Sequence, residues 1–125
     1  MSAPSPYPAE VRTRFRAAAR SGAPVAGARV GRGGDRRLGG DVELWLAVDA
    51  AGRIERAGFR AFGCPYTVAA ADLACERVTG RPLTELLAFD AGALIQELEV
   101  PPERFPVRIW IEDAMRAAAR SEEAT

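Results

Sequence analysis

The middle of the chain alternates between apolar and polar side chains, and this two-residue period constrains the fold more than any other feature. Residues 42–48 place an apolar side chain at every second position, and residues 57–61 do so again after the turn sequence Asp49-Ala50-Ala51-Gly52. Successive side chains of a strand point to opposite faces of a sheet. The pattern therefore predicts a β-hairpin with one buried face.

Helical patterns lie on both sides of this hairpin. A first helix is expected to begin near Pro8, because proline is favoured in the first turn of a helix. After Cys64, apolar residues recur at helical spacing until Gly80 and Pro82, which predict the end of that helix. A closing helix carries an apolar stripe that begins at Val107 and includes Trp110.

Two further expectations concern less regular parts of the chain. Residues 21–40 are rich in glycine and are predicted to form a loop, with one short strand around residues 28–31. In the closing helix, Glu112 and Arg116 stand four residues apart, so they are expected to form an ion pair on the solvent side. Short helices are expected around residues 83–88 and 91–98.

These elements predict an α+β fold, a small antiparallel sheet of about three strands with helices packed on one face. The chain of 125 residues is 48% hydrophobic, which suits one globular domain with a real core. We expect that domain to span residues 7–120. Residues 1–6, rich in Pro and Ser, are expected to be a disordered N-terminus, and residues 121–125 a C-terminal tail.

Composition removes several classes of function. Seventeen basic residues balance 17 acidic ones, so no net charge favours nucleic acid or a membrane surface. The sequence shows neither a spanning apolar run nor a signal peptide, which predicts a cytoplasmic protein. Histidine is absent and every basic residue is arginine, which excludes His-dependent triads and lysine Schiff bases. We therefore expect a protein that is not an enzyme.

Cys64 is the residue best placed for chemistry. It lies where the second hairpin strand ends and a helix begins, with Pro65 at the first helical position. The backbone N–H groups and the dipole of a helix N-terminus favour a thiolate over a thiol. The alternative is that Cys64 is a small buried apolar residue, as Cys75 on the apolar face of the next helix is expected to be.

Two charged groups near the hairpin are weaker candidates. Asp41 follows two glycines that let another group approach closely, although a carboxylate that caps its own turn is the simpler interpretation. Arg36 and Arg37 could hold an anion, but paired charges in a glycine-rich loop are usually only solvated.

The order of these motifs resembles the IscU/NifU-type iron–sulfur cluster assembly scaffold family. The similarity runs from about Tyr7 through Ala119. Its best segments are Gly40-Asp41-Val42, residues 49–64 (DAAGRIERAGFRAFGC), Pro101-Pro102 and Glu112-Asp113-Ala114. The resemblance implies the same α+β fold and a role in cluster biogenesis.

Family members hold a nascent [2Fe–2S] cluster with three cysteines and an assisting aspartate. The resemblance places the first cysteine at Gly39, the aspartate at Asp41, the second cysteine at Cys64 and the third at Val107, with Pro106 where the family has histidine. Only Asp41 and Cys64 are retained. The resemblance thus implies a sulfur acceptor at Cys64 and a metal contact by Cys64 and Asp41. Ligand positions are lost at Gly39, Pro106 and Val107.

A [2Fe–2S] cluster needs four protein ligands, and one chain offers two. We therefore expect no stably bound cofactor, only transient iron or an iron–sulfur cluster, and partners such as a cysteine desulfurase or other assembly proteins. The first hypothesis is a divergent scaffold-like protein that docks and handles sulfur or iron at Cys64 and Asp41. One alternative is an interaction module that kept the fold and lost the chemistry. The other is a redox protein with a single reactive thiol.

Overall fold

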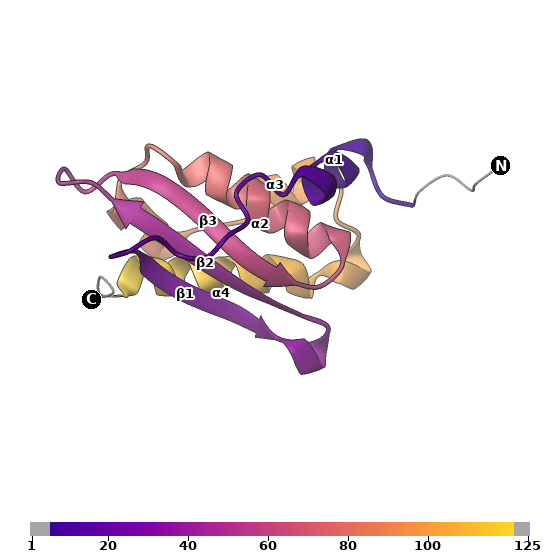
Figure 1. The fold of residues 1–125 in the computed structure, drawn as a ribbon. Helices are drawn as coiled ribbons and strands as arrows, with labels where there is room; N and C mark the ends of the chain where they lie inside the picture. Colours follow the sequence, from indigo (N-terminus) through magenta and orange to yellow (C-terminus); the bar gives the residue numbers. More distant parts are fainter. Residues whose placement is uncertain (1–5, 122–125) are drawn as a thin grey trace.

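The computed structural model describes residues 6–121 and shows a three-stranded antiparallel sheet with helices against one face (Figure 1). The strands are β1 (Arg29–Asp35), β2 (Gly40–Val48) and β3 (Ile54–Phe62), and the helices are α1 (Ala9–Ala17), α2 (Pro65–Val78), α3 (Gly92–Glu97) and α4 (Pro106–Arg120). Three 3₁₀ turns connect them, namely η1 (Arg36–Leu38), η2 (Leu83–Ala88) and η3 (Pro102–Arg104). Apart from Pro6 and Ser121, the predicted disordered N-terminus and C-terminal tail lie outside the described residues.

The sheet has the strand order β1-β2-β3, so the predicted hairpin forms its second and third strands. Leu44 pairs with Phe59, and the ladder continues to Asp41 opposite Phe62. The predicted short strand was wrong in extent, because β1 runs from Arg29 to Asp35 and pairs with β2 along its whole length. Three glycines in β1 leave little apolar alternation, and this is why the pattern suggested a loop.

The inner face of the sheet forms the core together with α2 and α4. Val42, Leu44 and Leu46 of β2 are almost fully buried there, as is Phe59 of β3. The stripe of α4 that packs against them consists of Val107, Ile111, Ala114, Met115 and Ala118, all buried. The predicted architecture, with helices packed on one face, is therefore confirmed.

The contact between α4 and β1 is unusually close. A Cβ atom at Gly31 would collide with the carbonyl oxygen of Ala114 and the amide nitrogen of Ala118, and one at Gly33 would collide with the carbonyl of Trp110. The helix backbone therefore lies directly on the strand backbone, which only glycine in the strand permits. The small residues of α4 complete this contact.

The first helix is attached to α2 through a buried carboxylate. Asp72 on α2 is 2% exposed and accepts hydrogen bonds from Arg14 Nη1 at 2.6 Å and from Arg20 Nη1 at 3.2 Å. A buried carboxylate is stable only when it is paired and hydrogen-bonded. These contacts therefore fix α1 and the segment that follows it against α2.

The predicted ion pair on the closing helix was wrong. Glu112 instead accepts hydrogen bonds from Arg108 Nε at 3.1 Å and from the Ala91 amide at 2.9 Å. Arg116 donates to the carbonyl of Phe89 at 2.9 Å. Both side chains are used to hold the segment around η2 and α3, which a periodicity argument confined to one helix cannot reveal.

No helix within residues 6–121 combines the length and the apolar character that crossing a membrane requires.

The contact between α4 and β1 can be tested with Gly31→Ala. The added methyl group would collide with backbone atoms of α4, so we expect a loss of about 2–3 kcal/mol in the free energy of unfolding, measured by urea denaturation. Gly52→Asn is the control, because Gly52 has φ +82° in an open turn and asparagine tolerates that conformation. Equal losses in the two variants would contradict the close contact.

Candidate functional site

Cys64 lies at the junction between β3 and α2, as the sequence predicts. It is the N-cap of α2, with Pro65 at the first helical position. The chain turns at Gly63, where φ is +152° and a Cβ atom would come within 2.8 Å of Thr67 Oγ1. The turn therefore requires glycine both for its backbone angle and for the space beside Thr67.

The start of a helix was expected to place free backbone N–H groups around the Cys64 sulfur, but two of the nearby amides are already hydrogen-bonded. The amides of Thr67 and Val68 both donate to the Cys64 carbonyl, at 2.9 and 3.3 Å, and Pro65 has no N–H. The polar contact of the sulfur is instead the hydroxyl of Thr67, 3.7 Å away on a side chain that is 1% exposed. Thr67 was missed at the sequence level, although side chains at the N-cap and three residues later commonly meet.

A pocket of about 120 Å³ opens beside this sulfur. Its lining consists of Leu38, Gly39, Cys64, Thr67, Glu103, Arg104, Pro106, Val107 and Trp110. Gly39, Pro106 and Val107, which the resemblance assigns to lost ligand positions, thus border the same small space as Cys64. The sequence separates them by up to 68 positions, and the fold brings them together.

Trp110 was expected only as part of the apolar stripe of α4. Its ring also borders the Cys64 pocket and packs on the backbone of Gly40, where a Cβ atom would lie 2.6 Å from the indole. Trp110 stands one helical turn after Val107, so its place at the site follows from helix geometry once Val107 is assigned there.

Asp41 does not border the Cys64 pocket. Its carboxylate accepts a hydrogen bond from Arg36 Nε at 2.9 Å, and the Arg36 guanidinium lies 4.6 Å from the centre of the Phe62 ring. The side chain lines a separate hollow on the outer face of the sheet. Arg36 is thus paired with Asp41, and Arg37 with Asp35 at 2.7 Å.

The second thiol has no access to this site. Cys75 is fully buried in the core, and its burial, with the charge of Asp72 adding to it, raises the pKa of the thiol far above its usual range. The prediction that Cys75 is a packing residue is in accord with this environment.

The donor set around Cys64 does not fit a resident metal centre. Across residues 6–121, no three side chains of His, Cys, Asp or Glu lie together as a metal ion would need. In the pocket the donors beside the sulfur are one hydroxyl and Glu103, while Pro106, Val107 and Trp110 form an apolar wall.

Two exposed apolar side chains lie in or next to the lining of the Cys64 pocket. Leu38 lines it and is 73% exposed, and Phe105, which precedes Pro106, is 59% exposed. Phe62 is also exposed, but it lies under the Arg36 guanidinium on the outer face of the sheet. Exposed apolar side chains gathered around one site are typical of a protein interaction surface.

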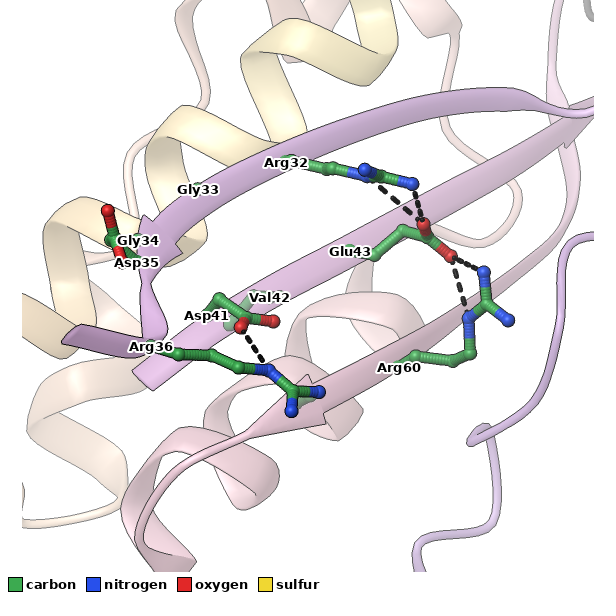
Figure 2. A pocket seen from close by; sticks show the side chains of 10 residues that line it. Arg32, Gly33, Gly34, Asp35, Arg36, Asp41, Val42, Glu43 and Arg60 are labelled. Carbon is green, nitrogen blue, oxygen red and sulfur yellow. Dashed lines mark hydrogen bonds and ion pairs between the residues drawn. The ribbon is translucent and has the colours of Figure 1, made fainter. Parts of the chain in front are cut away.

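A second, larger hollow of about 650 Å³ lies on the outer face of the sheet (Figure 2). Glu43 at its centre is 7% exposed and binds Arg32 Nη2 and Arg60 Nη2, each at 2.7 Å. Burial opposes ionisation of this carboxylate, but the hydrogen bonds and charges of the two arginines outweigh burial and hold the pKa of Glu43 below its usual range.

Known proteins resemble this chain in both sequence and fold. The family model of the NifU-like N terminal domain matches residues 7–123. The chain belongs to this family. The iron–sulfur cluster assembly scaffold protein IscU of Buchnera aphidicola is 38% identical over 80 residues, and that of Escherichia coli (strain K12) is 39% identical over 80 residues. Each match covers 63% of this chain and 62% of the relative, so it spans less than two thirds of the relatives' length.

Solved structures have the same fold. A putative iron–sulfur cluster assembly scaffold protein for the SUF system from Fervidobacterium islandicum AW-1 superposes with a TM-score of 0.73 at 19% identity, covering 91% of this chain and 96% of that one. The N-terminal part of a NifU-like protein from Brucella abortus gives 0.56 at 18% identity, covering 90% and 80%. At these identities the likeness concerns the fold.

The two thiols should differ strongly in reactivity. Cys64 borders an open pocket at a helix N-terminus, whereas Cys75 is buried and its thiol pKa is raised, so iodoacetamide should label Cys64 at least about 100-fold faster. Peptide mass spectrometry of the folded protein over time measures both rates, with Cys64→Ser as the control. Equal, slow labelling of both cysteines would contradict a chemical role for Cys64.

Glu43→Gln should make stability less dependent on pH. The folded-state pKa of Glu43 lies below its ordinary value of 4.5, so its contribution is complete above that value and is lost as the pH falls through the folded-state pKa. At pH 7 we expect a loss of about 1–2 kcal/mol. The difference from the parent protein should shrink below pH 4.5. Glu85→Gln, which removes an exposed pair with Arg81, should show little of either effect.

Proposed function

We propose that this protein takes part in iron–sulfur cluster assembly by docking on other assembly proteins and accepting sulfur at Cys64. It would not hold a durable cluster, and it would act without catalytic turnover. Membership of the NifU-like family and the position of Cys64 in a pocket at a helix N-terminus support this function. The main support for this function is the composition of one pocket. The Cys64 thiol lines it together with Gly39, Pro106 and Val107, the positions that the resemblance assigns to missing ligands.

The sulfur step follows from thiol chemistry. The Cys64 thiolate attacks the outer sulfur of a persulfide on the donor protein, in our proposal a cysteine desulfurase. A new S–S bond forms at Cys64 while the donor's S–S bond breaks, and the donor cysteine leaves as a thiolate that takes up a proton. No external oxidant or reductant is consumed. The Thr67 hydroxyl can donate a hydrogen bond to the Cys64 sulfur before the attack.

The exposed apolar rim supports docking at the same place. Leu38 lines the pocket and Phe105 is next to Pro106 of its lining, and both present exposed apolar surface, so burying them against a partner is favourable. The wall formed by Val107 and Trp110 would keep water from the transferred sulfur. Iron would bind only transiently, as cargo, at Cys64. Asp41 could act as a second iron ligand only after its ion pair with Arg36 breaks.

The test is sulfur transfer from a cysteine desulfurase supplied with cysteine. We expect one added sulfur atom on Cys64 in the Cys75→Ala variant and none in Cys64→Ser, by mass spectrometry under non-reducing conditions. Desulfurase binding without sulfur acceptance would favour the pure interaction module. Oxidation of Cys64 by peroxide without sulfur acceptance would favour a thiol redox protein.

Anaerobic reconstitution with iron and sulfide tests the shortage of ligands. We expect no persistent visible absorbance and less than stoichiometric iron after desalting, because the chain supplies too few donors. A coloured monomer with a stable, stoichiometric cluster would overturn this part of the proposal.

A further inference from the structure

The outer face of the sheet carries charged side chains that the proposed sulfur chemistry does not use. Arg32 on β1 and Arg60 on β3 project from this face on either side of Glu43, and Arg36 extends beside Asp41 at its lower end (Figure 2). The helices pack on the opposite face of the sheet, so this face is open and polar, as in many antiparallel sheets. It presents exposed guanidinium groups over a hollow of about 650 Å³.

Positive charge exceeds negative charge on this face, although the whole chain is neutral. Four guanidinium groups, those of Arg32, Arg36, Arg56 and Arg60, stand against the carboxylates of Asp41 and Glu43. Asp35, which also borders the hollow, is already paired with Arg37. The outer face therefore has unsatisfied positive charge.

The arginines are held in place and remain accessible. The side chains of Arg32, Arg36 and Arg60 are 76%, 71% and 55% exposed. The bond from Arg36 to Asp41 uses Nε, so its fork of Nη groups can bind a further carboxylate. Arg36 stacks on Phe62, and Arg56 lies 5.6 Å from the ring centre of Trp45. Such contacts reduce the side-chain entropy that binding would cost.

We propose that the outer face of the sheet is a second docking surface, which binds an acidic segment of a partner protein through Arg32, Arg36 and Arg60. Charge complementarity selects carboxylates, and arginine beside aromatic rings is a composition enriched in protein interfaces. The chain as a whole carries no net positive charge, so it lacks the long-range attraction to phosphates that nucleic acid binding uses. This surface is separate from the Cys64 pocket, so the proposal does not depend on sulfur transfer.

The two tryptophans of the chain allow the two surfaces to be distinguished in one titration. Trp45 lies on the outer face, with its indole N–H bound to the Gly22 carbonyl, and Trp110 borders the Cys64 pocket. A synthetic peptide of alternating glutamate and alanine is added to the ¹⁵N-labelled full chain. We expect the Trp45 indole resonance and the amides of β2 and β3 to shift, while the Trp110 indole stays unchanged.

Charge variants test the assignment. Arg36→Gln with Arg60→Gln should weaken binding of the peptide at least about fivefold, whereas Arg77→Gln with Arg81→Gln, which removes equal charge from α2 and the segment after it, should change binding less than about twofold. Arg36→Gln alone, at an exposed side chain, guards against misfolding of the double variant and should show a smaller loss in the same direction.

Three outcomes would overturn the proposal. The first is equal weakening by both double variants, which would indicate general charge attraction. The second is a shift confined to Trp110. The third is tighter binding of polyphosphate than of the acidic peptide at equal charge, which would assign the face to phosphate. Failure of sulfur transfer to Cys64 would leave this surface unaffected, and loss of peptide binding would leave Cys64 labelling unaffected.

Discussion

The close contact between the backbone of α4 and the backbone of β1 underlies the rest of the structure. Gly31 and Gly33 let the helix lie directly on the strand, and this fixes the height of α4 above the sheet. Val107 and Trp110 are thereby brought to the end of the sheet where Cys64 stands. If a side chain separated the two elements, the Cys64 pocket would lose its wall. The geometry of the site thus depends on two residues that take no part in its chemistry.

In this NifU-like protein the Cys64 thiol and the Asp41 carboxylate belong to two different hollows. The junction of β3 and α2 places a cysteine beside a buried hydroxyl, whereas the opposite wall of the pocket is apolar. Asp41 is engaged by Arg36 on another surface. A site of this kind can accept an atom through one covalent bond but does not surround a cluster with four ligands. Its apolar rim suits contact with a protein better than retention of an inorganic group.

The hairpin, the helix after Cys64 and the stripe of α4 could be predicted from the sequence because their apolar periods are regular. The bounds of β1 could not be predicted in this way, because Gly31, Gly33 and Gly34 have no side chains and so give no alternation of apolar and polar residues. The role of Thr67 and the partners of Glu112 depend on contacts across distant segments, which local spacing does not encode. The resemblance named Gly39, Pro106 and Val107, and only the fold showed that they share one pocket with Cys64.

The arrangement of Glu43 between Arg32 and Arg60 has a consequence for how the strands align during folding. A glycine-rich strand such as β1 has few side chains to define its pairing, so it is prone to slip. A shift of β1 by one residue would turn the Arg32 guanidinium toward the helices and away from Glu43. Misaligned sheets would therefore carry a buried, unpaired charge, which costs several kcal/mol. The same three charges that hold the outer face together thus select the correct register.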